Sequence, residues 1–190
     1  MKNIVIFGSG GHARSVFQEI LKNKNYNFLG FVDEKKAIGK VIVKYKSKKY
    51  SIIGSIREVV KKKINFCGII AIGLNNIRQK VFKDIININK NFIFEKIISH
   101  DAIINENVSI GEGSVIMSGV VINIGSNIGK HCIINTSCAI DHDNIIENFS
   151  SLGPGVITGG AVKIKTGAHI GIGSVIQQNI TIGDSAIIGS

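Results

Sequence analysis

The chain has 190 residues, of which 44% are hydrophobic and 19% are charged, so it can bury a core and is not intrinsically disordered. No apolar run approaches the roughly 18 residues that span a bilayer, and the apolar stretch near the N-terminus stops at glycines, which predicts a soluble cytoplasmic protein without a membrane partner. The formal net charge of +10 invites a nucleic-acid partner, but the lysines have no interleaved aromatic residues and Trp is absent, so we expect none.

The first half of the chain predicts alternating strands and helices. Strands are expected at residues 4–7, 28–32 and 67–72, and helices at about 13–23 and from 76 through 83. This order predicts a small Rossmann-like parallel α/β domain over residues 1–92. The three cysteines, Cys67, Cys132 and Cys138, form no CxxC pair, so the sequence predicts neither a disulfide framework nor a metal site.

A glycine-rich turn follows the first predicted strand. Gly8, Gly10 and Ala13 satisfy the dinucleotide fingerprint, and Asp33 follows about 20 residues later. Backbone N–H groups at a helix N-terminus would serve any nucleotide phosphate, whereas glycines that only make a tight turn are the alternative. A domain of about 90 residues has no second mononucleotide-binding half, which argues against NAD.

Three strand ends carry candidate ligand-binding residues. Because the carboxyl ends of parallel strands meet at one edge of an open sheet, these turns are expected to converge there. We interpret this edge as a sugar-nucleotide pocket whose substrate-binding residues are Gly10, Gly11, His12, Asp33, Glu34 and Gly73.

A six-residue repeat dominates the second half of the chain. Fifteen of sixteen positions spaced six residues apart are Ile or Leu, and the exception is Thr158. The series is Ile98, Ile104, Ile110, Ile116, Ile122, Ile128, Ile134, Ile140, Ile146, Leu152, Thr158, Ile164, Ile170, Ile176, Ile182 and Ile188. A period of six fits neither a helix nor an ordinary strand and indicates a hexapeptide β-helix.

Each hexad predicts one short strand and one corner, with the aliphatic residue pointing inward. Three hexads complete a triangular coil, and coils stack about 4.8 Å apart. The position four residues further on is mostly small, as in Ser114, Ser126, Cys132 and Cys138, and is expected to fit the tight corner. The β-helix is expected over residues 93–190, in roughly five coils.

The repeat resembles the hexapeptide-repeat acyltransferases, which implies a left-handed parallel β-helix. The order of the two domains resembles bacterial sugar acetyltransferases, including sialic acid O-acetyltransferases and enzymes that N-acetylate UDP-4-amino-4,6-dideoxy sugars. The sharpest resemblance lies in residues 135–143, NTSCAIDHD. It implies that His142 is the catalytic base, that Asp143 takes the place of the acidic partner, and that Asn135 binds substrate. From the residues alone, Asp141 or Asp143 could contact the ring.

The resemblance also implies acetyl-CoA as cosubstrate, bound near Ser151, Gly160 and Ile172. The chain departs from the family at Ser151, where many relatives carry a histidine that contacts acetyl-CoA. It also stops at Ser190, before the last coil and terminal segment that usually help to hold the cofactor, so either the chain is truncated or the site is unusually open. Coil arithmetic places Gly160 one coil above His142, with room for a thioester arm.

The sequence therefore predicts an acetyl-CoA-dependent N-acetyltransferase for a nucleotide-linked 4-amino-4,6-dideoxy sugar in bacterial surface-glycan biosynthesis. O-acetylation of sialic acid or a related nonulosonic acid is the enzymatic alternative, and a non-catalytic β-helix that binds a nucleotide sugar is the alternative from another class. The resemblance further implies a homotrimer with active sites between neighbouring prisms.

Overall fold

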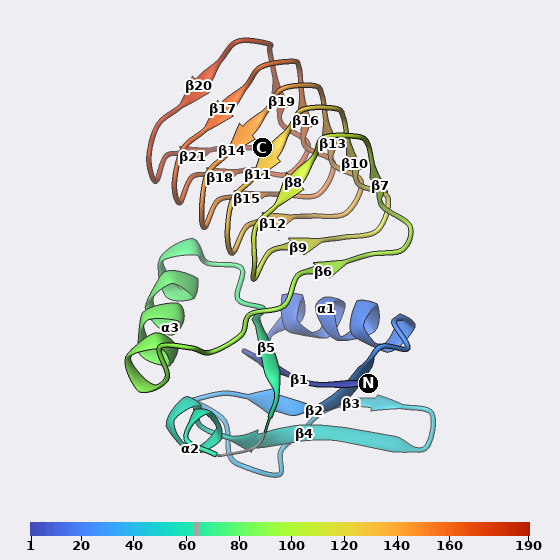
Figure 1. Cartoon of the computed structure of the whole chain (residues 1–190), viewed down its shortest axis with the longest axis vertical. Coiled ribbons are helices and arrows are strands. Elements are labelled where there is room, and N and C mark those ends of the chain that lie inside the picture. The colour runs from blue at the N-terminus through green and yellow to red at the C-terminus, as the bar shows by residue number, and fades with distance from the viewer. Residues whose placement is uncertain (63–64) are drawn as a thin grey trace. The chain divides into compact units, whose positions relative to one another are not determined.

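The computed structural model describes residues 1–62 and 65–190, which form two compact units, Met1–Glu95 and Lys96–Ser190. The first unit is an α/β domain and the second is a left-handed parallel β-helix, which confirms the predicted fold class (Figure 1). None of the described helices has both the length and the apolar content to cross a membrane.

The first unit contains a five-stranded sheet in the order β3-β4-β2-β1-β5. Strands β1, β2, β4 and β5 run parallel, and β3 pairs antiparallel with β4 in a hairpin that the sequence analysis did not predict. The elements are β1 (Lys2–Phe7), α1 (Gly11–Lys22), β2 (Tyr26–Val32), β3 (Val41–Tyr45), β4 (Lys48–Gly54), α2 (Ile56–Val60), β5 (Cys67–Ile70) and α3 (Asn75–Ile88).

Helix α1 is held by its apolar face, because Ala13, Val16, Phe17 and Ile20 are all buried. Strand β1 lies between β2 and β5, and its last four residues are buried as well. This central position makes the turns after β1, β2 and β5 neighbours at the carboxyl edge of the sheet.

The second unit consists of sixteen two-residue strands on three faces, and each predicted inward position is the second residue of a strand. The first face comprises β6 (Ile97–Ile98), β9 (Val115–Ile116), β12 (Ile133–Ile134), β15 (Ser151–Leu152), β18 (His169–Ile170) and β21 (Ile187–Ile188). The second face comprises β7 (Ile103–Ile104), β10 (Val121–Ile122), β13 (Ala139–Ile140), β16 (Ile157–Thr158) and β19 (Val175–Ile176). The third face comprises β8 (Ser109–Ile110), β11 (Asn127–Ile128), β14 (Ile145–Ile146), β17 (Lys163–Ile164) and β20 (Thr181–Ile182).

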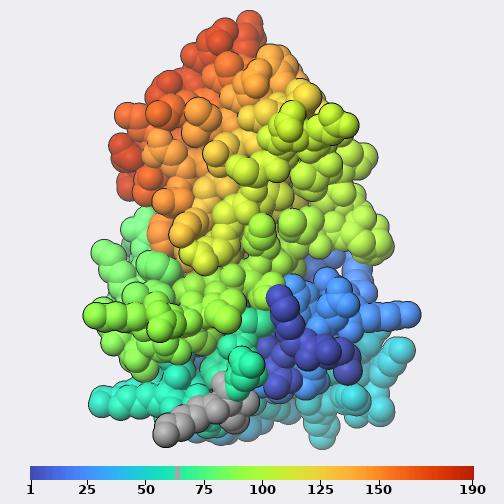
Figure 2. Space-filling model, viewed as in Figure 1, coloured from blue at the N-terminus to red at the C-terminus, as the bar shows by residue number. Residues whose placement is uncertain are grey.

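Parallel pairing joins each strand to the one eighteen residues away, for example Ala139 to Ile157. The inward aliphatic side chains form one continuous core along the stack. Figure 2 shows the same stack in space-filling form, from green to red in chain order.

The small residues lie in the corner region, between the turn and the next strand, and their side chains point into the prism. Ser126 and Ser150, for example, are fully buried. Each donates a hydrogen bond to the carbonyl fifteen residues further on, Asp141 O at 2.8 Å and Lys165 O at 2.8 Å respectively. Where the residue at this position is polar, its side chain therefore satisfies a buried corner carbonyl.

Tight corners follow each strand, and the third residue after the inward aliphatic residue adopts a left-handed conformation at most of them. Glycine supplies this conformation at Gly125 and Gly155, but Asp143 adopts it with φ +58°. The backbone thereby determines where the Asp143 carboxylate is placed.

Candidate functional site

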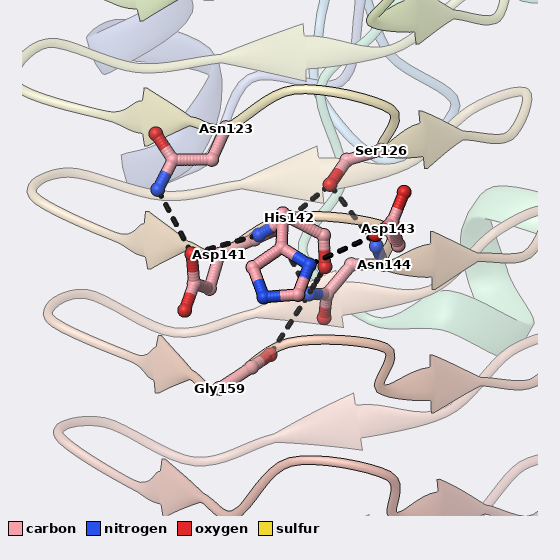
Figure 3. A network of polar contacts seen from close by, with 7 residues as sticks. All are labelled: Asn123, Ser126, Asp141, His142, Asp143, Asn144 and Gly159. Atoms are coloured by element: carbon pink, nitrogen blue, oxygen red, sulfur yellow. Dashed lines mark hydrogen bonds and ion pairs between the residues drawn. The ribbon is translucent and has the colours of Figure 1, made fainter.

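His142 lies at the corner between β13 on the second face and β14 on the third face, with 54% of its side chain exposed. Its Nδ1 lies 2.8 Å from Asp143 Oδ2 (Figure 3). A carboxylate can only accept a hydrogen bond, so the ring hydrogen belongs on Nδ1 and the lone pair of the neutral ring belongs to Nε2. The ring is thus oriented as a proton acceptor.

Asp141 does not bind the imidazole but holds the backbone beside it. Its Oδ1 accepts a hydrogen bond from the His142 backbone N–H at 2.8 Å and another from Asn123 Nδ2 at 3.0 Å. Asn123 in turn accepts from Asn105 at 2.8 Å, which continues the ladder into the preceding coil. The bond from Asn123, followed by that from His142, lowers the pKa of Asp141. Between the two neighbouring acids, Asp143 is therefore the ring partner.

The two carboxylates also favour the protonated imidazole. The hydrogen bond to Asp143 is the largest cause that raises the pKa of His142, followed by the charge of Asp141. A raised pKa makes the neutral ring a stronger base, although a larger fraction of the ring is then protonated at neutral pH.

Gly160 lies against the ring, one coil further along the prism. An ideally placed Cβ at Gly160 would lie 2.5 Å from both Cε1 and Nε2 of His142, so only glycine leaves the ring in this position. The preceding Gly159 is equally restricted, because its Cβ would lie 2.8 Å from the backbone nitrogen of Gln178. The glycine pair thus lets the next coil pack closely against the ring and against Gln178.

The other predicted residues of the β-helix do not share this corner. Asn135 follows β12 at the corner between the first and second faces, and its Oδ1 accepts from the Thr136 N–H at 2.9 Å. Ile172 follows β18 at the same corner and is 65% exposed, while Ser151 is buried in β15 of the first face. Within one prism, His142, Asp143 and Gly160 thus lie at the corners between the second and third faces. Asn135 and Ile172 lie on the opposite side of the second face, at its corners with the first face.

In the first unit, the turns after β1, β2 and β5 lie together. The Ser9 hydroxyl donates to Asp33 Oδ2, and Lys36 Nζ donates to the Ser9 carbonyl at 2.9 Å. Gly8 has φ +106°, and its Cβ would lie 2.8 Å from the Ile72 side chain. The close packing of these turns explains why a glycine stands at position 8.

The glycines predicted to bind substrate border open space. An ideal Cβ at Gly10, Gly11 or Gly73 would meet no atom within 4 Å. Gly10 is the N-cap of α1 and provides no side-chain cap, so the first N–H groups of the helix remain available to an anion. This arrangement suits a phosphate group.

His12 lies on the first turn of α1, and its Nε2 is buried without a hydrogen-bond partner among residues 1–62 and 65–190. Burial, assisted by the charge of Arg78, lowers the pKa of His12 to about 4, so the ring is neutral at physiological pH.

Glu34, which was predicted to bind substrate, accepts a hydrogen bond from the Ile56 N–H at 2.6 Å, and this bond holds the start of α2. One oxygen of Glu34 thus has a structural partner.

The sequence analysis did not identify two residues of the His142 corner. Asn123 supports Asp141 from the preceding coil, and the buried Asn144 binds carbonyl groups beneath His142. The repeat could have singled out Asn144, because it is an amide at the position four residues after the inward aliphatic residue, where the other residues are small or aliphatic.

In the described parts of the chain, no group of three or more His, Cys, Asp or Glu side chains could hold a metal ion.

Residues 3–85 match the family described as the PglD N-terminal domain. A mutant of perosamine N-acetyltransferase from Caulobacter crescentus, solved with CoA and GDP-perosamine, is 27% identical with a TM-score of 0.88, covering 100% of this chain and 87% of that one. The acetyltransferase domain of PglB from Neisseria gonorrhoeae FA1090 is 24% identical with a TM-score of 0.79, over 99% of this chain and 91% of that domain.

WeeI from Acinetobacter baumannii AYE is 23% identical with a TM-score of 0.80, covering 100% of this chain and 89% of that one, and shares the fold. The similarity to the Caulobacter enzyme runs from one end of this chain to the other and includes both units. With the domain match over residues 3–85 and the hexapeptide repeat, it shows a chain that is similar over its whole length to the hexapeptide-repeat sugar acetyltransferases.

Proposed function

We propose that the protein is an acetyl-CoA-dependent N-acetyltransferase that acts on the amino group of a nucleotide-linked 4-amino-4,6-dideoxy sugar in bacterial surface-glycan biosynthesis. The observation that carries the proposal is the His142 corner, where Asp143 binds Nδ1 at 2.8 Å and Gly160 lies against Nε2. The Caulobacter enzyme, whose structure holds CoA and GDP-perosamine, supports an amino sugar as the acceptor.

His142 acts as the general base in this proposal. The neutral amine of the sugar attacks the thioester carbonyl, a C–N bond forms, and Nε2 of His142 takes the amine proton as the C–S bond breaks. The proton passes to the departing CoA thiolate, so the imidazole is regenerated. Asp143 keeps the ring in the required tautomer and stabilises the imidazolium that forms transiently.

Acetyl-CoA fits the space beside Gly159 and Gly160. A side chain at Gly160 would displace the ring, so the missing Cβ is a condition for holding Nε2 where it can meet a thioester. We assign a further cosubstrate contact to the exposed Ile172 and a substrate contact to Asn135, whereas the predicted cosubstrate residue Ser151 is buried in β15 and presents little surface.

The first unit supplies the nucleotide-sugar site. The open helix N-terminus at Gly10 and Gly11 is suited to the phosphates, and we assign the neutral His12 ring, on the first turn of the same helix, to the sugar nucleotide. Gly73, which follows β5, also borders open space, and we assign Gly73 and Asp33 to the same site.

A homotrimer would bring the two groups of β-helix residues together. The second face lies between their corners, and its outward residues are all apolar: Ile103, Val121, Ala139, Ile157 and Val175. Ile103, Ile157 and Val175 are 57%, 47% and 70% exposed. Covering this face with another copy would bury it and place the His142 corner of one prism against the Ile172 corner of the next.

A substrate panel tests the function. Wild-type protein and His142→Ala are incubated with acetyl-CoA and either nucleotide-linked amino sugars or sialic acids, and CoA release and acetylated product are measured. The proposal requires His142-dependent N-acetylation of an amino sugar. Acetylation restricted to sialic acid hydroxyls would replace it with the O-acetyltransferase function, and tight sugar binding without turnover would indicate a binding scaffold.

A further inference from the structure

Asn144 is fully buried, and its side-chain amide nitrogen binds three backbone carbonyls. Nδ2 donates to Asp141 O at 2.9 Å, to His142 O at 3.2 Å and to Gly159 O at 2.9 Å (Figure 3). Because carbonyl oxygens can only accept, these contacts fix the orientation of the amide with its nitrogen toward the corner. With two hydrogens for three acceptors, one hydrogen is shared.

Other residues at the same position of the repeat do less. Ser126, Cys132, Cys138 and Ser150 each bind the carbonyl fifteen residues further on, which for Asn144 is that of Gly159. The two additional bonds of Asn144 go to its own corner, at Asp141 and His142. Ser174 adds one bond of this kind, to Gly171 O at 3.0 Å, and Cys132 adds one to Lys130 O at 3.7 Å, whereas the amide of Asn144 binds the carbonyls at both positions of its corner.

Asn144 also carries a stability cost that a smaller residue would avoid. Its Oδ1 is buried without a hydrogen-bond partner in the described part of the chain, as is Oγ1 of Thr158, the residue before Gly159. A buried unsatisfied oxygen is destabilising. Asn144 and Thr158 both depart from the small or aliphatic pattern of the interior, and both are next to the Gly159 carbonyl. Departures of this kind concentrate at functional sites.

We propose that Asn144 is a positioning residue, which holds the backbone of His142 in fixed register with the Gly159–Gly160 corner of the next coil. The His142 carbonyl also accepts from the Ala161 N–H at 2.9 Å, so Asn144 and Ala161 together connect the two corners. The proposal rests on the proposed function. The register of the two corners matters because it sets the position of Gly160 beside Nε2 of His142. Asn144 acts through the backbone, because its side chain is inside the prism.

Asn144→Ser separates the two tasks of the side chain, because serine keeps a donor for the Gly159 carbonyl but has a single hydrogen and cannot hold all three carbonyls. We expect kcat to fall by about 10- to 100-fold with little change in KM for either substrate, as a misplaced catalytic group produces. The matched control is Ser114→Ala, a buried residue at the equivalent position that donates to Gly129 O at 2.7 Å. It should lower thermal stability at least as much as Asn144→Ser and leave kcat within about twofold of wild type.

A titration of the His142 ring by NMR gives a readout that is independent of turnover. In Asn144→Ser we expect the pKa of His142 to fall toward its ordinary value, because a loosened corner weakens the hydrogen bond to Asp143. An unchanged pKa together with an unchanged kcat would overturn the positioning role. If wild-type protein acetylates no amino sugar, the proposed function fails, yet the titration still decides whether Asn144 positions the ring.

Discussion

The His142 imidazole lies against the α-carbon of Gly160, a residue eighteen positions away in the chain and one coil away in space. Coil stacking, not sequence proximity, creates this contact. Because the proposed base and the glycine beside it belong to different coils, each of the two residues can be substituted without changing the other.

Gly160→Ala should inactivate the enzyme without unfolding it. The new methyl group would lie 2.5 Å from the ring, which is exposed and can turn away at the cost of its bond to Asp143. We expect turnover to fall by about 100-fold, as for other small misplacements of a catalytic group, with the circular dichroism spectrum unchanged. Gly183→Ala is the control, since its Cβ would meet no atom within 4 Å. Normal turnover in Gly160→Ala would refute the role of this contact.

His142→Ala should reduce turnover by roughly 10² to 10⁴-fold, the usual contribution of a positioned general base. The fold should persist, because the side chain is exposed at a corner and contributes nothing to the inward core. Raising the pH should partly restore activity toward an amino sugar, since a neutral amine carries a usable lone pair, but not toward a hydroxyl acceptor. Rates measured from pH 6 to 10 on both acceptors would show the difference, and equal rescue would contradict the mechanism.

Asp143→Asn should move the acidic limb of the pH–rate profile to lower pH. The hydrogen bond to Asp143 raises the pKa of His142, and the base works only when deprotonated, so removing the carboxylate lowers the pH at which activity appears. The plateau rate should also fall, because the transient imidazolium loses its counter-charge. Asparagine tolerates the left-handed backbone at this corner, where φ is +58°, so the fold should not change. A shift of the limb to higher pH would exclude this assignment.

Gly10→Leu should weaken binding of the nucleotide sugar and leave acetyl-CoA binding unchanged. A Cβ at this position meets no protein atom within 4 Å, so we expect the leucine side chain to extend into the proposed site without straining the domain. Gly8→Ala provides the contrast, because its φ of +106° and its 2.8 Å approach to Ile72 should lower stability by about 1–3 kcal/mol. Calorimetric titration with each ligand and thermal unfolding would separate the two effects. Equal loss of both ligands in Gly10→Leu would move the sugar site elsewhere.

Sedimentation equilibrium should give three times the chain mass of 20.5 kDa. Ile157→Asp should lower that mass, because it places a charge in the middle of the apolar second face, where the side chain is 47% exposed. Lys163→Asp, on the third face, is the matched control and should remain trimeric. A monomeric wild-type protein at working concentrations would rule out the trimer.

The sequence alone determined the β-helix, because its inward side chains repeat every six residues and each inward position recurs in every coil. A pattern this regular fixes the strands to the residue, and all sixteen predicted positions are the second residues of strands. It also placed His142 beside two acids and opposite Gly160, since stacking by eighteen residues is simple arithmetic.

The tertiary structure decided what the repeat leaves undetermined. Asp141 and Asp143 flank His142 equally in the sequence, and only the left-handed backbone at Asp143 directs its carboxylate to the ring, while Asn123 from the preceding coil holds Asp141 away. The role of Asn144 likewise depends on carbonyls that converge from two coils. Periodicity specifies which residues stack, but hydrogen-bond direction depends on backbone angles that only the folded coil fixes.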